Sequence, residues 1–196
     1  MKVIRRVTMV VSAGLVVAAC GPAGSGNIVS EPREVDAFDS IQISGGVDLA
    51  LIVDDGAEAS VTVVYDDNLQ ERIITELEGT TLVVRSRGTF NVVGEGRHVE
   101  VVAPTLNELS ASGGSDVDGD GVLESMILDA SGGSDVDLSD LEVTSMIVNI
   151  SGGSDATVNV TEEIEGNASG GSDLTILGDP ANQRVEVSGG SEVSNG

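Results

Sequence analysis

Acidic side chains close a short phrase that repeats along the second half of the chain. The phrase reads Ser-Gly-Gly-Ser-Asp four times and Ser-Gly-Gly-Ser-Glu once, and its copies start 19, 20, 18 and 19 residues apart. The acids that close it are Asp116, Asp135, Asp155, Asp173 and Glu192. Carboxylates are preferred ligands of calcium, and a pair of them can also catalyse glycoside hydrolysis. The repeated acids therefore suggest two kinds of chemistry.

Calcium binding by these acids depends on stacking, because the phrase does not match a known calcium motif. The β-roll repeat G-G-x-G-x-D-x-U-x has about half the present period and different residues. If repeats stacked ~4.8 Å apart, neighbouring carboxylates would repel each other by about 1 kcal/mol in bulk water. A bound cation would relieve this repulsion, and so would outward splay of the side chains. The candidate Ca²⁺ ligands are Asp116, Asp135, Asp155 and Asp173.

Enzymatic chemistry has little support in the other residue types. Glycosidase clefts usually carry aromatic sugar platforms and basic residues, whereas the repeats contain no aromatic residue and one base, Arg184. The only histidine, His98, lies beside Val99 in an alternating segment that favours a structural role. No G-x-S-x-G nucleophile motif is present. The chain is therefore predicted to be non-enzymatic, with no catalytic residues and no cofactor other than a candidate calcium ion.

The only cysteine, Cys20, is predicted to carry a lipid. Lys2, Arg5 and Arg6 precede an apolar stretch at residues 7–19, which is too short to span a bilayer and is typical of a signal peptide. The sequence Val-Ala-Ala-Cys at residues 17–20 resembles the lipobox of bacterial lipoproteins. Residues 1–19 are thus predicted to be a cleaved signal peptide, and acylated Cys20 is predicted to anchor the chain to a membrane.

This anchor implies an extracytoplasmic location in the cell envelope. Gly21 follows the cysteine where an aspartate would signal retention in the inner membrane. The outer membrane is therefore the expected destination if the source has two membranes. Residues 20–37 (CGPAGSGNIVSEPREVDA) are rich in Gly, Pro and Ser, and are predicted to form a flexible tether.

The overall composition excludes one class of partner and limits the core. Acidic residues outnumber basic residues 33 to 9, giving a formal net charge of −24. Nucleic acid is not an expected partner, because phosphate binding requires a basic patch. Aromatic residues make up 2% of the chain and Trp is absent. The core is expected to be narrow and built from layers of aliphatic side chains.

Alternation around each phrase predicts the elements that would carry the acids. The residues three and one before the first serine are apolar or glycine, and the residue between them is polar. These ten residues are Leu109, Ala111, Leu128, Ala130, Val148, Ile150, Gly166, Ala168, Val185 and Val187. The residue after the closing acid is again apolar, and the glycine pair suits a corner with positive φ.

Two to three short strands in each repeat favour an all-β, parallel β-solenoid with coils of about 19 residues. A β-sandwich remains the alternative fold. The related phrase SGGVD at residues 44–48 indicates that the coils begin earlier, within a less regular β portion. Residues 38–196 are predicted to form a single domain.

Several segments of this domain resemble the bacterial family called "putative autotransporter adhesin, head GIN domain". The segments are residues 38–52 (FDSIQISGGVDLALI), 66–69 (DDNL), 79–84 (GTTLVV) and 99–109 (VEVVAPTLNEL), together with the SGGSD repeats. The resemblance implies a secreted or lipid-anchored β-helix-like domain with an adhesive role. It provides no catalytic residues.

Two functions follow as hypotheses. In the first, the chain is an adhesive or scaffolding lipoprotein that binds an envelope protein or a glycan. In the second, it is a membrane-tethered sensor or structural lipoprotein whose acidic face works with divalent cations. The sequence does not identify the ligand.

Replacing Cys20 with serine tests the predicted anchor. Because serine cannot accept the thioether-linked lipid, we expect C20S to move from the detergent phase to the aqueous phase in Triton X-114 partitioning. Metabolic labelling with a palmitate analogue should mark the wild type only. Partitioning of C20S with the membranes to the same extent as the wild type would contradict the lipoprotein prediction.

Overall fold

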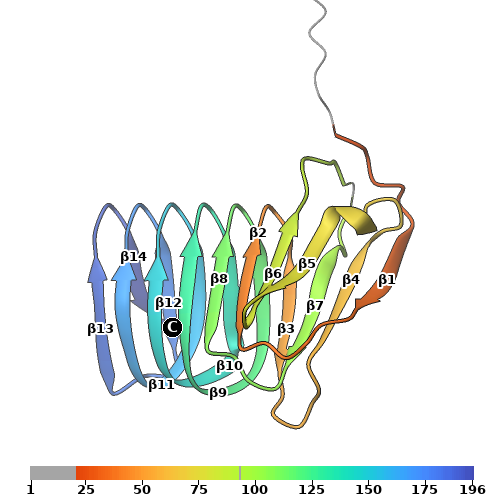
Figure 1. The fold of residues 1–196 in the computed structure, drawn as a ribbon. Helices are drawn as coiled ribbons and strands as arrows, with labels where there is room; N and C mark the ends of the chain where they lie inside the picture. The colour runs from red at the N-terminus through yellow and green to blue at the C-terminus, as the bar shows by residue number, and fades with distance from the viewer. Residues whose placement is uncertain (1–20, 93) are drawn as a thin grey trace, which may run out of the picture.

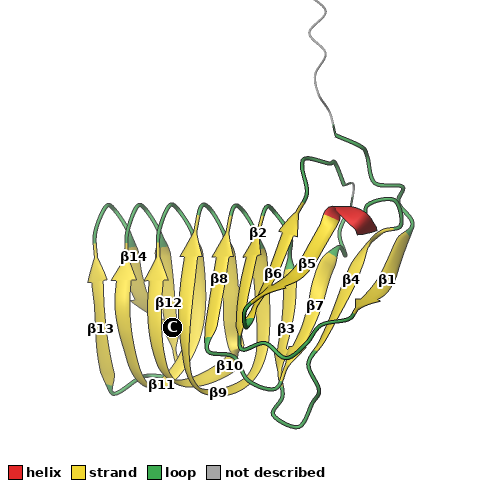
Figure 2. Cartoon of the chain, viewed as in Figure 1, coloured by secondary structure: helices red, strands yellow, loops and turns green. Residues whose placement is uncertain are grey.

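The computed structural model describes residues 21–92 and 94–196, so the predicted signal peptide and Cys20 lie outside the described residues. The described part is almost entirely strand and loop, with one helical turn, the 3₁₀ segment η1 at Gln70–Arg72 (Figures 1 and 2). This confirms the all-β prediction. No helix in this part is long and apolar enough to cross a membrane.

Three long strands form the centre of the molecule. They are β9 (Asp116–Ser131), β10 (Asp135–Ile150) and β11 (Asp155–Ala168), and each bends along its length and spans most of one sequence repeat, which we call a coil (Figure 1). β10 pairs in parallel with β9 on one side and with β11 on the other. Each repeat therefore lies directly on the previous one.

Shorter strands continue the stack at both ends. After β11, β12 (Asp173–Leu177) and β13 (Asn182–Val187) pair with its two halves, and β14 (Glu192–Asn195) pairs with β12, all in parallel. Before β9 come β2 (Ser40–Ser44), β3 (Leu49–Val53) and β8 (Glu108–Ser112). β2 pairs in parallel with β8, and β3 pairs in parallel with β9. The phrase SGGVD therefore lies in the same stack as the SGGSD phrases.

Antiparallel strands close the N-terminal end of the stack. β6 (Thr81–Ser86) and β7 (His98–Ala103) pair in parallel with β2 and β3. β5 (Ile73–Glu78) then pairs antiparallel with β6, and β4 (Ser60–Asp66) pairs antiparallel with β7. The change of direction ends the coil pattern and covers the first coils (Figure 1).

The tether predicted for residues 20–37 is wrong over residues 28–33. These residues form β1 (Ile28–Arg33), which pairs antiparallel with β4 along its whole length. Pro32 is tolerated because β1 lies at the edge of the sheet, with β4 as its only paired strand in the described part. The order of β1 comes from backbone hydrogen bonds to β4, since its own sequence contains few apolar residues.

A buried ion pair holds the residues before β1 against the same end of the stack. Asp66 is fully buried and pairs with the Arg97 guanidinium, which also donates from Nη2 to Asp66 Oδ1 at 3.2 Å. The Gly26 amide donates to the same oxygen at 2.6 Å. The hydrogen bond from Arg97 lowers the pKa of Asp66, so its carboxylate stays charged and keeps both donors.

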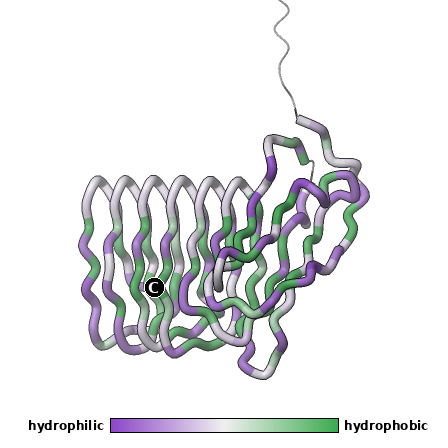
Figure 3. Tube along the Cα trace, viewed as in Figure 1, coloured by the Kyte–Doolittle hydropathy of each residue, from purple (hydrophilic) through white to green (hydrophobic). Residues whose placement is uncertain are grey.

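The residues predicted to point inward form the core. Val148, Ile150, Val136 and Leu128 are each no more than 1% exposed. Figure 3 shows the alternation of apolar and polar residues along the strands and the near-neutral corners between them. Val187, in the last described coil, is 48% exposed because a neighbouring coil covers it on one side only.

The second serine of each phrase joins neighbouring coils at the corner. Ser115, Ser134, Ser154 and Ser172 are all buried. The Ser134 amide donates to Ser154 Oγ at 3.2 Å, and Ser134 Oγ donates to the Ser131 carbonyl at 3.1 Å. Gly132 has a φ of 69°, and a Cβ there would lie 3.2 Å from the Gly113 nitrogen of the adjacent coil. The glycines and the second serine of each phrase therefore have a structural role, which is to form the corner between strands.

A matched pair of substitutions in β10 tests the inward register. Ile150→Asp places a charge in the buried column and should cost several kcal/mol, roughly 3 or more. Ile147→Asp, three residues earlier, changes a side chain that is 49% exposed and should cost less than about 1 kcal/mol. Urea unfolding of both variants measures the two costs. Similar losses of stability would contradict the register.

Candidate functional site

The structure brings the repeated acids into one column, as their spacing predicts. Asp135 is paired in register with Asp116 and with Asp155. The column continues from Asp155 to Asp173 and from Asp173 to Glu192. A second column runs beside it and contains Asp118 and Asp137, followed by threonines 157 and 175 and Ser194. Both columns face solvent.

Crowding of carboxylates changes their ionisation. Partial burial raises the pKa of Asp135, and the negative charges of Asp116 and Asp155 raise it further. Asp48, which lies next to Asp116, also has a raised pKa, mainly because burial disfavours its charge. A hollow of about 240 Å³ is lined by Asp116, Asp118, Asp135 and Asp137. Neighbouring carboxylates therefore repel each other most strongly around Asp135.

The acid column is a line of carboxylates and not a preformed metal cage. Within residues 21–92 and 94–196, no group of three or more His, Cys, Asp or Glu side chains is arranged to hold a metal ion. Calcium binding at Asp116, Asp135, Asp155 and Asp173 stays a prediction. His98 lies half-buried on β7, with Nε2 3.3 Å from Glu100 Oε1 on the same strand. Its described contact is a surface pair.

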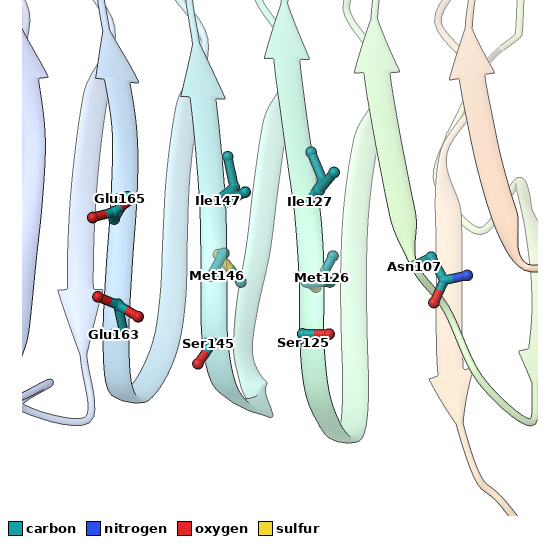
Figure 4. Close-up of a pocket in the computed structure, with 9 residues that line it drawn as sticks. All are labelled: Asn107, Ser125, Met126, Ile127, Ser145, Met146, Ile147, Glu163 and Glu165. Carbon is teal, nitrogen blue, oxygen red and sulfur yellow. The ribbon is translucent and has the colours of Figure 1, made fainter.

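A hollow that the sequence analysis did not predict lies on another face of the stack (Figure 4). It has a volume of about 410 Å³ and crosses neighbouring coils. Its lining residues are Asn107, Ser125, Met126, Ile127, Ser145, Met146, Ile147, Glu163 and Glu165. Figure 4 shows Ile127 and Ile147 side by side, with Glu163 and Glu165 on the next strand.

The hollow forms because short and long side chains occupy adjacent columns. Ser125 is paired in register with Ser145, and Ile127 with Ile147. The isoleucines are 36% and 49% exposed, so they form an apolar wall beside the low serine column. Met126 lies between Ser125 and Ile127 in the sequence, is buried, and also lines the hollow.

A second hollow adjoins the first and shares Asn107 and Ser125 with it. Its volume is about 800 Å³. It carries four acids, Asp54, Asp55, Asp120 and Glu124, and two exposed aliphatic side chains, Ile52 and Val122, which are 49% and 68% exposed. We call the two hollows together the axial groove.

One signal in the sequence could have revealed the axial groove. The residue four places before the first serine of each phrase is polar in three repeats, at Glu108, Glu165 and Arg184. In the other two repeats it is Ile127 or Ile147. These isoleucines lie on the outward side of the strand, where an aliphatic residue gains nothing from the core.

Comparisons with known proteins identify the fold. A sequence model described as "Putative auto-transporter adhesin, head GIN domain" matches residues 37–130 and 123–180. A putative adhesin from Bacteroides fragilis has 16% identity and a TM-score of 0.59, over 89% of this chain and 100% of that chain. Another from Parabacteroides distasonis has 19% identity and a TM-score of 0.55, over 89% and 99%. A search of curated proteins finds no match.

The raised pKa of Asp135 predicts a pH dependence of stability. Because the folded state holds this proton more tightly than the unfolded state, the ionised carboxylate costs stability above its unfolded pKa, near 3.8. We expect Asp135→Asn to melt roughly 2–4 °C above the wild type at pH 7 and low salt, and the difference to vanish as pH falls toward 4. Calorimetry measures both.

Asp36→Asn is the control, because Asp36 is exposed and lies outside the columns. It should change the melting temperature by less than about 1 °C at any pH. A gain for Asp135→Asn that persists unchanged at pH 4, or that equals the gain for Asp36→Asn, would show that the column does not repel itself.

Proposed function

Because the chain belongs to the family described as "Putative auto-transporter adhesin, head GIN domain", we propose that it is a non-enzymatic, adhesive or scaffolding module of the cell envelope. Two of the matching solved structures are named as putative adhesins, which supports an extracytoplasmic location. The observation that carries the proposal is the regular display of outward side chains. Most outward positions of one coil are aligned with the matching positions of the next, at a spacing of ~4.8 Å.

This display suits binding to an extended or repetitive partner. We infer that the stack is a parallel β-solenoid with coils of about 19 residues, which is supported by the in-register pairing of β9, β10 and β11. Its lateral faces are stiff because every internal strand is paired on both sides. A stiff surface loses little conformational entropy on binding, so weak contacts at each coil add effectively.

The proposed anchor would hold this surface in a defined orientation. Residues 24–27 contact residues 66–68 through several hydrogen bonds, including Ser25 N to Asn68 Oδ1 at 3.0 Å and Asn27 Nδ2 to Asp67 Oδ2 at 3.0 Å. An acyl group at Cys20 would therefore hold the antiparallel end of the stack near the membrane. β13 and β14 lie at the opposite end (Figure 1).

The acid column favours a second candidate function. Asp116, Asp135 and Asp155 are aligned, and the pKa of Asp135 is raised by its partial burial and by repulsion from the charges of the other two. Cations would relieve this repulsion, so the chain can be proposed as an envelope lipoprotein whose acidic face works with divalent cations. This candidate differs from the first because it needs no macromolecular partner.

Liposomes that carry the purified, acylated full chain test the first function. They would be passed over surfaces coated with envelope proteins or envelope glycans, and retention would be measured by fluorescence. We expect retention above that of protein-free liposomes on at least one coating. Liposomes prepared with C20S should behave as the protein-free ones, because that variant would not attach.

Equal retention of loaded and empty liposomes on every coating would contradict the adhesive function. The second candidate would then be supported if calcium raised the melting temperature well beyond sodium chloride of the same ionic strength. Equal effects of the two salts would indicate screening alone, since the Debye length is about 10 Å at 0.1 M.

A further inference from the structure

We propose that the axial groove binds an extended, cationic peptide segment of a partner protein, in which lysines or arginines alternate with aliphatic residues. This inference rests on the proposed binding function and names the class of partner. It uses the face that carries Ile127 and Ile147, and not the acid column on the neighbouring face.

The apolar part of the groove provides the binding energy. Ile127 and Ile147 present a continuous aliphatic wall, and the second hollow adds Ile52 and Val122. Val122 is 68% exposed and is paired in register with Glu142, which is also exposed. Covering such side chains contributes about 25 cal/mol for each Å² removed from water, and they gain none of it in the free chain.

The charge around the apolar wall selects a cationic ligand. Six acids line the two hollows, namely Asp54, Asp55, Asp120, Glu124, Glu163 and Glu165. Among residues 21–92 and 94–196, no arginine or histidine lines either hollow. The nearest base along the stack is Arg184, which already pairs with Glu165. The Glu163 side chain is exposed, has no hydrogen-bond or ion-pair partner among the described residues, and is available to a ligand.

A peptide fits these groups better than a glycan does. Sugar sites usually offer aromatic faces, and none of the three aromatic residues of the chain lines the groove. Phe38 and Tyr65 are buried, and Phe90 packs edge-on against Tyr65 with ring centroids 6.4 Å apart. An extended peptide directs alternate side chains to opposite sides, so one set can reach the isoleucines while the other reaches the carboxylates.

The first experiment uses synthetic peptides and the purified full chain. The probe is a peptide of about twelve residues that alternates lysine and valine, long enough to cross the groove at ~3.3 Å per residue. One control peptide alternates lysine and glycine, and another alternates glutamate and valine. By calorimetric titration at physiological ionic strength, we expect the lysine-valine peptide to bind at least about tenfold more tightly than either control.

The second experiment locates the site with variants. Ile127→Ser with Ile147→Ser should weaken binding of the lysine-valine peptide about tenfold or more, and Glu163→Gln should weaken it severalfold and reduce its salt dependence. Val187→Ser is the matched apolar control, because Val187 is 48% exposed and Ile147 is 49% exposed. Glu78→Gln is the charge control, since Glu78 is exposed on β5. Neither control should change binding.

The outcomes separate this inference from the proposed function. Binding that is equal for the lysine-valine and lysine-glycine peptides, or unchanged in the groove variants, would overturn the groove assignment. If a glycan binds the wild type and the Ile127 and Ile147 double variant does not bind it, the assignment of a peptide ligand to the groove would be overturned. Liposome retention that survives in that double variant would leave adhesion intact and place it elsewhere on the stack.

Discussion

Each inner coil obtains its backbone hydrogen-bond partners from the coils before and after it, and the corners and surface columns of the repeats follow from that arrangement. The ladder from β9 through β10 to β11 keeps residues of the same kind opposite one another over most of its length. A corner must therefore recur in nearly the same place in each coil. The Gly-Gly pair provides the turn, and serine hydroxyls accept from corner amides, as Ser154 Oγ does from the Ser134 amide.

The same ladder determines what the surface can do. Residues of the same type are often paired in register on neighbouring coils. Carboxylates that recur at one outward position therefore form a column of mutually repelling charges, and amides that recur at one position form a hydrogen-bonded column. Asn149 illustrates the second case, since it donates to Asp129 at 2.9 Å and accepts from Asn167 at 3.1 Å. Where the column is Ile127 and Ile147, the result is an apolar wall. Thus single residue choices are amplified into surfaces that span several coils.

The sequence repeat predicts which residues of each strand are buried. It does not predict features that depend on contacts between residues far apart in the sequence. Val148 and Ile150 are correctly predicted to be buried, because alternation around the phrase fixes their side of the strand. β1 is missed because its stability comes from the backbone of β4, whose paired residues lie 28 to 38 positions further along the chain. The axial groove is missed because Asn107 and Ser125 meet only once the coils are stacked. The Asp66 and Arg97 ion pair is missed for the same reason.

Distances between spin labels test the stacking most directly. In a C20S background, which contains no other cysteine, labels at Asp116→Cys and Asp173→Cys should lie three coil spacings apart, roughly 14 Å between backbones. Moving the second label to Glu192→Cys adds one coil and should increase the distance by about 5 Å. Distances that do not grow with the number of intervening coils, as expected for a β-sandwich, would contradict the stack and the columns built upon it.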